Sequence, residues 1–423
     1  MVSMIIKSGR VIDPAANIDG EHDVLIENGR IKAVEKPGTL PQQADEVVEA
    51  KGLWVLPGLI DMHVHLREPG HEYKETVASG LKAAAAGGFT AVVAMPNTSP
   101  AMDNAEQVAA LLNRAEEAGS ARVWPAAAMT KGRAGEELAE YEDLKAAGAV
   151  AVTDDGSWVK SPKVLRRVLD YAAVIGLLPL CHAEDHDLSK GGAIHEGLVS
   201  TRLGLPGIPA QAEINAVTRD INMVELSGRP LHFCHISTKG AVEAIGAAKA
   251  KGLPVTCETA PHYLFLTHED VGDYDTNAKM NPPLRTEEDR EALWQALMSG
   301  AVDAIATDHA PHSVLEKEVE FIDAAFGIIG LESALPLALS LVWEGVLTPG
   351  RLVELMSLNP ARLLSIPGGD LKPGQVADLT IVDPEQRFVL KPEDSRSLSR
   401  NSPFWNREFK GRAVHTIVNG RKI

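Results

Sequence analysis

The sequence predicts an α/β fold, in which a TIM-like (β/α)8 barrel is joined to a small β domain built from both ends of the chain. Eight short apolar runs alternate with stretches of helical periodicity, which indicates parallel βα units and, at eight, a closed barrel. The two ends carry only short strands and turns, and neither has enough apolar surface to fold alone. An open doubly wound sheet is the alternative, but it usually has a Gly-rich phosphate loop after its first strand, which this sequence lacks.

Length and composition fit this architecture. The 423 residues are 45% hydrophobic and 23% charged, which is ordinary for a globular protein, and they suffice for one large and one small domain. The net charge of −17 argues against a nucleic acid or an anionic membrane as partner, because both need a basic face. Three cysteines make no disulfide framework, and we find no signal peptide and no apolar run long enough for a membrane span. We therefore expect a cytoplasmic protein.

The ends of the chain are expected to pair with each other. Strand-like runs cover residues 4–7, 23–27, 31–35, 375–382 and 413–419. Asp13-Pro14, Asn28-Gly29 and Asp383-Pro384 are strong turn signals. We expect residues 1–54 and 366–423 to form the small β domain, and residues 55–365 to form the barrel.

Inside the barrel region, the expected strands run into polar residues. They end near His63/His65, Asn97, Met129, Asp155, His182, His235, His262 and Asp308. Helical periodicity covers residues 74–86, 105–118, 136–147, 162–175, 212–226, 240–251 and 287–298. Because the carboxyl ends of barrel strands face the active site, these polar side chains are expected to meet there.

Six of these polar residues have the side chains of a metal site. They are His63, His65, Asp155, His182, His235 and Asp308. Imidazoles and carboxylates suit Zn²⁺, and also Co²⁺ or Mn²⁺. His63 and His65 are two apart in a strand and therefore point the same way. A His-x-His pair alone is a weak signal, and His182 and His235 have a simpler interpretation as hydrogen-bonded core residues; the cluster as a whole favours the metal.

Three neighbouring features allow two interpretations each. Cys181 and Cys234 precede His182 and His235, and we expect both thiols to pack in the helix-facing layer rather than to take part in catalysis. Of Asp154 and Asp155, one can form a turn beside Gly156 while the other bridges two metals, and strand alternation does not decide between them. Asp308 can cap a helix, or it can ligate a metal and exchange a proton with bound hydroxide.

Several motifs together resemble one enzyme family. Residues 57–70 (PGLIDMHVHLREPG) resemble the signature of the cyclic amidohydrolases, a segment that alone would also fit hydantoinases and allantoinases. Together with residues 95–98 (MPNT), 153–156 (TDDG), 279–285 (KMNPPLR) and 308–312 (DHAPH), it resembles the type I bacterial dihydroorotases. This resemblance runs from Met4 to the end of the chain.

The resemblance implies two Zn²⁺ ions per chain. His63 and His65 would bind one with Asp308, His182 and His235 would bind the second, and Asp155 and hydroxide would bridge the two. Hydantoinases and allantoinases carry a carbamylated lysine at that strand end. Here Lys160 lies beyond Gly156 in the following loop, a departure that the type I dihydroorotases share.

The resemblance also implies the substrate contacts, which are His65, Arg67, Asn97, Asn281, His312, Phe326 and Gly327. Arg67 lies on the same side as His65 and can hold a carboxylate through two hydrogen bonds. A surface ion pair with Glu68 or Glu72 is its simpler interpretation, and the two asparagines can instead be turn residues. The long connection over residues 313–330, which includes Phe326, is a candidate lid.

The activity implied is reversible hydrolysis of (S)-dihydroorotate to N-carbamoyl-L-aspartate in de novo pyrimidine (UMP) biosynthesis. A metal-activated hydroxide attacks the amide carbonyl, and Asp308 passes the proton to the departing ring nitrogen. One alternative is a hydantoinase or dihydropyrimidinase, whose neutral substrates would leave Arg67 without a partner. The other is a non-catalytic amidohydrolase-like scaffold that assembles with a partner such as aspartate carbamoyltransferase, although every ligand position is filled. A homodimer is the other assembly that we consider.

Overall fold

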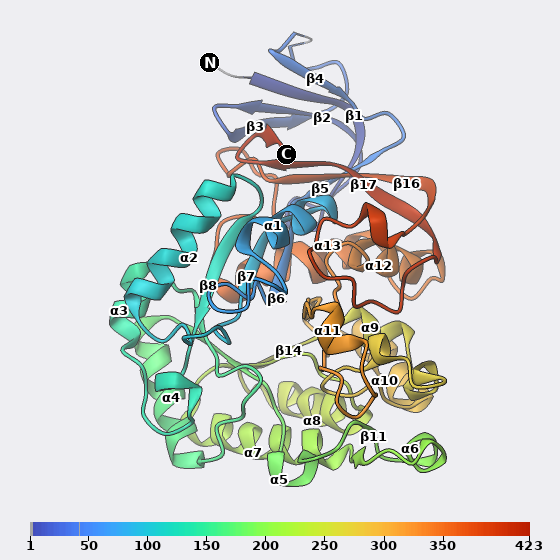
Figure 1. Cartoon of the computed structure of the whole chain (residues 1–423). Coiled ribbons are helices and arrows are strands. Elements are labelled where there is room, and N and C mark those ends of the chain that lie inside the picture. Colours follow the sequence, from blue (N-terminus) through green and yellow to red (C-terminus); the bar gives the residue numbers. More distant parts are fainter. Residues whose placement is uncertain (1–2, 42) are drawn as a thin grey trace.

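The computed structural model describes residues 3–41 and 43–423 and contains a nearly closed parallel barrel beneath a separate sheet (Figure 1). The barrel strands are β6 (Leu59–Val64), β7 (Phe89–Ala94), β8 (Arg122–Ala127), β9 (Ala151–Val152), β10 (Leu178–Cys181), β13 (Leu231–Phe233), β14 (Val255–Thr259) and β15 (Ala304–Ile305). Neighbouring strands pair in parallel from β6 to β15. A parallel bridge between Val64 and His309 joins the two edges. The predicted fold class is confirmed.

The helices that cover the barrel are close to the predicted ranges. They are α1 (Val77–Ala86), α2 (Ala105–Ala118), α3 (Tyr141–Ala147), α4 (Pro162–Ile175), α7 (Gln211–Ser227), α8 (Lys239–Ala250) and α10 (Glu287–Ser299). Side-chain caps from Thr76, Asn104 and Ser161 explain why α1, α2 and α4 begin where they do. The prediction placed the start of α3 too early, because residues 131–133 form a 3-10 turn and Leu138 bridges to Thr130.

Shorter elements lie in the connections and at the C-terminal side of the barrel. The helices are α5 (His186–Ser189), α6 (Leu198–Leu203), α9 (Pro261–Phe265), α11 (Val314–Lys317), α12 (Ala334–Trp343), α13 (Pro349–Val353) and α14 (Asn359–Leu364). The 3-10 and π turns are η1 (Pro14–Ala16), η2 (Lys131–Arg133), η3 (His268–Val271), η4 (Thr276–Ala278), η5 (Glu354–Leu358) and η6 (Pro392–Asp394). β11 (Ile194–His195) and β12 (Gly207–Ile208) form a two-stranded sheet. Within the described ranges, no helix is both long and apolar enough to span a membrane.

Both ends of the chain contribute to the second sheet. Its strands are β1 (Ser3–Asp13), β2 (Ile18–Glu27), β3 (Arg30–Glu35), β4 (Glu46–Glu49), β5 (Trp54–Pro57), β16 (Leu379–Val389), β17 (Glu408–Val418) and β18 (Arg421–Lys422). Most pairs are antiparallel, whereas β4 and β5 run parallel to β1. β5 joins the two ends, because it pairs with β1 on one side and with β16 on the other. Asp383-Pro384 does not end a strand as predicted, since β16 continues through a register shift there.

The barrel interior and the helix-facing layer form separate clusters of buried side chains. Strand residues such as Met62, Val93 and Leu180 pack with α14 in the interior cluster. Cys181 belongs to the cluster that includes the outer helices, as predicted, and its Sγ donates to Asp220 in α7 at 3.0 Å. Cys234 belongs to the interior cluster. The prediction for Cys234 was therefore wrong, because β13 ends at Phe233 and strand alternation no longer governs the next residue.

Candidate active site

The six predicted metal-ligand residues lie together at the carboxyl ends of five barrel strands. His63 lies in β6 and His65 follows it directly. Asp155, His182, His235 and Asp308 follow β9, β10, β13 and β15. None of the six is more than 5% exposed. This convergence follows from the parallel order of the strands, which brings all their carboxyl ends to one rim.

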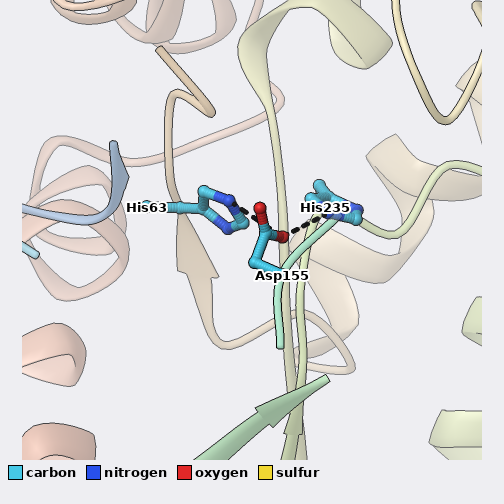
Figure 2. Close-up of side chains that lie close together, drawn as sticks. All are labelled: His63, Asp155 and His235. Atoms are coloured by element: carbon cyan, nitrogen blue, oxygen red, sulfur yellow. Dashed lines mark ion pairs between the residues drawn. The ribbon is translucent and has the colours of Figure 1, made fainter. Parts of the chain in front are cut away.

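Asp155 lies at the centre of the four imidazoles. Its Oδ1 is 3.3 Å from His63 Nε2, 3.5 Å from His235 Nε2 and 3.7 Å from His182 Nδ1. Its Oδ2 is 3.6 Å from His65 Nε2. Figure 2 shows the carboxylate between the rings of His63 and His235. Asp308 lies on the other side, with its Oδ1 at 2.9 Å from His65 Nε2 and 3.6 Å from His63 Nε2.

Hydrogen bonds on the far side of three rings fix which nitrogen faces the cluster. His63 Nδ1 contacts Glu258 Oε1 at 3.1 Å, and His65 Nδ1 contacts Asn97 Oδ1 at 2.8 Å. Each contact directs the opposite nitrogen, Nε2, into the cluster. In His182 the order is reversed, because Nε2 contacts Glu184 Oε2 at 2.8 Å and Nδ1 faces inward. A metal-binding histidine typically holds a carboxylate or an amide on its second nitrogen in this way.

Two inward-facing atoms have no hydrogen-bond partner. His63 Nε2 and Asp155 Oδ1 lie 3.3 Å apart, but each is buried without a hydrogen bond among the described residues, and buried polar atoms without hydrogen bonds are costly. Two sets of three ligand atoms, His63–Asp155–His235 and His63–His65–Asp308, each lie within 4.8 Å of one another. Imidazole nitrogens and carboxylate oxygens so arranged fit a divalent metal ion.

In the cluster, neighbouring opposite charges outweigh the effect of burial on the pKa values of His63, Asp155 and Asp308. Burial disfavours a charge on His63, but the Asp155 and Asp308 carboxylates outweigh it and raise the pKa of His63 well above its usual value. Burial likewise opposes charge on Asp155 and Asp308, yet neighbouring imidazoles, His63 foremost, hold the pKa of both carboxyls below the usual range. Both carboxylates are therefore ionised at neutral pH and available as metal ligands.

Three residues of the site have a left-handed backbone conformation. The φ angle is 61° at Arg67, 38° at His235 and 46° at Asp308. Such a conformation costs about 1–3 kcal/mol for a residue other than glycine and persists only where the surroundings impose it. At all three positions it occurs where the chain leaves a barrel strand, so the strain accompanies the turn that presents the side chain.

The paired aspartates have different surroundings. Asp154 accepts hydrogen bonds from Thr130 N at 3.0 Å and Thr130 Oγ1 at 2.5 Å, and so tethers the β8–α3 connection. Asp155 faces the imidazoles. Lys160, whose side chain is more than half exposed, pairs with Asp187 Oδ1 at 2.9 Å and lies outside the cluster.

Arg67 lies beside the cluster and is only 9% exposed. Its Nε donates to Pro311 O at 3.1 Å, and one terminal nitrogen lies 3.3 Å from His312 Nε2. Neither acid of the simpler interpretation pairs with it, because Glu68 binds Arg114 and Glu72 accepts from Gly70 N. Burial lowers the pKa of Arg67 to about 10, so it keeps its charge at neutral pH.

The two predicted amide residues also border the cluster. Asn97 accepts from His65 Nδ1, which leaves its amide N–H groups free to donate elsewhere. Asn281 Nδ2 donates to Glu184 Oε2 at 2.9 Å, while its buried Oδ1 has no hydrogen-bond partner among the described residues. The site thus offers both a donor and an unsatisfied acceptor for a cyclic amide.

Phe326 and Gly327 lie in the long connection after β15. Phe326 is half-buried, with Lys279 Nζ 4.5 Å from its ring centre. Gly327 N donates to Lys279 O at 3.0 Å. A Cβ on Gly327 would come within 2.6 Å of Ala310 O and 2.7 Å of His312 Cδ2, so only glycine fits here.

Two buried lysines hold the connection over residues 313–330 in place. Lys317 Nζ donates to Ala325 O at 2.8 Å and Gly327 O at 3.2 Å. Lys279 Nζ donates to Phe321 O at 2.7 Å and Ile322 O at 2.9 Å. This segment, including α11, is therefore tied to residue 279 and to itself rather than extended into solvent.

Sequence reasoning missed the carboxylates that support the histidines. Glu258 is 1% exposed and contacts both His63 and His232, the latter at 3.2 Å. Glu184 contacts His182 and Asn281. The available signal was an acidic residue within or just beyond an apolar barrel strand, which is costly to bury unless it is paired.

Comparisons with known proteins agree with this geometry. A family model described as "Dihydro-orotase-like" matches residues 52–241. A curated dihydroorotase from Geobacter metallireducens is 51% identical to this chain, with 100% of this chain and 99% of the relative covered. The dihydroorotase from Syntrophotalea carbinolica is 53% identical, covering 99% and 98%, and that from Syntrophus aciditrophicus is 49% identical, covering 100% and 99%.

Solved structures share the architecture over the whole chain. L-hydantoinase (dihydropyrimidinase) from Arthrobacter aurescens superimposes with a TM-score of 0.88 at 26% identity, covering 100% of this chain and 96% of that one. A dihydropyrimidinase from Brevibacillus agri gives a TM-score of 0.85 at 23% identity, covering 100% and 95%, and shows the fold alone.

Proposed function

We propose that this chain, which belongs to the dihydroorotase family, catalyses the reversible hydrolysis of (S)-dihydroorotate to N-carbamoyl-L-aspartate in pyrimidine biosynthesis. The chain is a metal-dependent cyclic amidohydrolase. The observation that carries the choice of substrate is Arg67, a buried cation with no carboxylate at ion-pair distance among the described residues. A substrate carboxylate would complete this site, whereas a neutral cyclic diamide would leave the guanidinium unpaired.

We propose that the metal is zinc and that each chain holds two ions. His63, His65 and Asp308 would hold one, His182 and His235 the other, and Asp155 would lie between them. His63 Nε2 and Asp155 Oδ1, which have no hydrogen-bond partner among the described residues, support this assignment. Bound metal supplies a water of lowered pKa and polarises the substrate carbonyl.

The remaining steps, substrate binding and proton transfer, depend on side chains of the site. Arg67 and His312 bind the carboxylate, and Asn97, Asn281 and the backbone at Gly327 orient the ring beside His65. The water oxygen adds to the amide carbonyl carbon, and Asp308 accepts the proton that the water releases. Asp308 then donates this proton to the ring nitrogen as the C–N bond breaks. Ring closure is the same sequence in reverse.

We also propose that the enzyme is cytoplasmic and consists of two domains. We propose that residues 1–54 and 366–423 form the small β domain and residues 55–365 the catalytic domain; β5, over residues 54–57, lies in the sheet of the two ends.

We also propose homodimerisation or association with aspartate carbamoyltransferase. Exposed apolar side chains near the site, Leu315 at 86% and Val314 at 54%, offer a surface for such contacts. Size-exclusion chromatography with and without the partner tests both.

The deciding experiment is hydrolysis of dihydroorotate by purified protein, with metal content determined on the same sample. We expect turnover to increase with bound divalent metal up to two ions per chain. Metal-loaded protein that is inert on dihydroorotate but opens hydantoins would identify a hydantoinase instead. A chain that takes up no metal under any reconstitution condition would leave only the scaffold interpretation.

Arg67 provides a variant that separates the two enzyme classes. We expect Arg67→Met to lower kcat/KM for dihydroorotate by about 100-fold or more, because an ion pair in a buried site is lost. Slow hydrolysis of a neutral hydantoin should change much less. A similar loss on both substrates would assign Arg67 a structural role and remove the main support for dihydroorotate.

A further inference from the structure

A segment far along the chain from the barrel strands reaches the candidate site. We define the C-terminal strap as residues 395–402, between η6 and β17. In Figure 1 this stretch lies in the red part of the chain that leaves the second sheet and returns to the barrel. None of its residues was singled out by the sequence motifs. Five of its eight side chains are nevertheless buried, and four of these five are serines.

The strap is anchored beside the loop that carries Arg67. Glu75, which is fully buried, accepts from Leu398 N at 3.1 Å and from Ser397 Oγ. Ser399 Oγ donates to Lys74 O at 2.7 Å. Lys74 Nζ in turn lies 3.4 Å from His312 Nδ1. The strap therefore has a fixed place between the connections that follow β6 and β15.

Asn401 is the residue of the strap that contacts the substrate-binding segments. Its Oδ1 accepts from His312 N at 3.0 Å, and its Nδ2 donates to Ala310 O and Gly327 O, each at 2.9 Å. Its own carbonyl accepts from Ile329 N at 2.9 Å. The side chain is 3% exposed, so these bonds form without competition from bulk water.

These four bonds span two pieces of chain that must be aligned with each other. One piece carries His312, which lies against Arg67, and the other carries Gly327, where no Cβ fits. The side-chain amide is the neutral group that can donate two hydrogen bonds from its NH2 and accept another at its carbonyl oxygen. Replacement by aspartate keeps the acceptor for His312 N and loses both donors.

We propose that Asn401 is a positioning residue that aligns His312, which binds the substrate carboxylate, with Gly327, which orients the substrate ring. The inference rests on the proposed function for the identity of the substrate. Asn401 touches neither the predicted metal ligands nor Arg67 in the described contacts, so its effect should fall on substrate binding rather than on metal uptake or proton transfer.

The test is the Asn401→Ala variant in the metal-loaded full chain. We expect KM for dihydroorotate to rise about tenfold or more, kcat to change less than about threefold, and metal content to remain that of wild type. Asn359→Ala is the matched control. Asn359 Nδ2 donates to Asp303 O at 2.8 Å near the amino end of β15, so the control loses a similar bond away from the substrate. Its KM should be unchanged.

Hydrogen exchange supplies a readout that does not depend on the substrate. In Asn401→Ala, the amide of His312 should exchange faster because its side-chain acceptor is lost, while Ile329 N keeps the main-chain carbonyl of residue 401 and stays protected. Peptides from the opposite end of the barrel should also keep their protection. Asn401→Asp also serves if the alanine variant does not fold. Because Asp has lost both donors, KM should rise, and because Asp still accepts from His312 N, the protection of His312 should be largely kept.

The outcomes separate the two proposals. Wild-type protein inert on dihydroorotate contradicts the proposed function, and exchange at His312 still tests the alignment by Asn401. Unchanged KM in the folded variants overturns the positioning role. So does a fall in kcat at constant KM, or faster exchange spread over the whole barrel, since either would mark a general structural defect.

Discussion

At the scale of single residues, the surroundings of each carboxylate determine what it can do. Asp308 contacts His65 and lies near His63, and both imidazoles help to keep it ionised. Its positive φ occurs in the turn by which the chain leaves β15 at the rim of the barrel. As a base, Asp308 accepts the proton with one lone pair of its carboxylate. The amide of an asparagine in its place cannot accept and return a proton.

We therefore expect Asp308→Asn to lower kcat by about 10²–10⁴-fold, which is the usual loss on removing a general acid–base group. Substrate binding should be largely kept, since Arg67 and the amides are untouched. Steady-state kinetics and equilibrium binding of N-carbamoyl-L-aspartate would measure the two effects. Near-normal turnover would refute the role that we assign to Asp308.

Asp154 and Asp155 provide a pair of adjacent, buried carboxylates with different partners. Asp155→Asn should reduce metal content, or weaken metal binding by about 10–100-fold, because the centre of the imidazole cluster loses its charge. Asp154→Asn should bind metal as wild type does, since its amide oxygen still accepts from Thr130. Metal analysis after dialysis against a chelator distinguishes them. Equal metal loss in both variants would contradict the assignment of Asp155.

At the scale of elements, the periodic helices were the easiest to predict. α2 and α4 match the predicted bounds because each has a capping residue and a glycine at its end. The strands β9 and β15 are only two residues long. The polar residues that follow them were therefore a clearer sequence signal than their short apolar runs. The connections were harder. Neither the contacts of Lys317 nor those of Asn401 have a local sequence pattern, because their partners are backbone groups of other loop residues, which almost any residue type can provide.

Lys317 makes the connection over residues 313–330 sensitive to pH. Burial, with Lys279 nearby, lowers the pKa of Lys317 to about 7 from the usual 10.5. The unfolded chain therefore binds more protons between these values, and stability rises with pH by up to about 1.4 kcal/mol per unit. We expect Lys317→Met to gain less stability than wild type from pH 7 to pH 10, as measured by urea unfolding.

Lys239→Met is the control for this experiment. Its exposed ammonium contacts Glu288 at 2.7 Å, and this contact raises the pKa of Lys239 above 10.5. The contribution of Lys239 is therefore constant up to about pH 10 and is lost only as pH rises further. The gain from pH 7 to pH 10 should match that of wild type. A wild-type gain in Lys317→Met as well would contradict the pH dependence assigned to Lys317.

At the scale of the whole molecule, the second sheet is bonded directly to the barrel. Thr380 in β16 is fully buried; its Oγ1 donates to Gly88 O at 2.6 Å and accepts from Leu59 N at 3.2 Å. Gly88 has no room for a Cβ there, because Thr380 Cγ2 would be 2.8 Å away. One hydroxyl therefore satisfies two backbone groups at the amino ends of β6 and β7.

Replacing Thr380 by valine keeps the shape and leaves both backbone groups unsatisfied. We expect the free energy of unfolding to fall by about 1–3 kcal/mol, with KM unchanged. Thr380→Ser keeps the hydroxyl and should lose less, because only a methyl group is removed. Thermal or urea unfolding measures both. A valine variant as stable as wild type, or a serine variant less stable than the valine variant, would contradict this account of the junction.

The antiparallel pairing of β5 with β16 has a consequence for how the protein is made. Thr380 is 321 residues further along the chain than Leu59. At a synthesis rate of about 5–20 residues per second, the first strands wait roughly 15–60 s at the ribosome before their partner emerges. For that time β5 presents an open sheet edge, the kind that invites aggregation, whereas β1 already pairs with β2 and β4. Asn401 is made later still. A chain that stalls before this residue can build every metal ligand and still lack the contact that aligns His312 and Gly327.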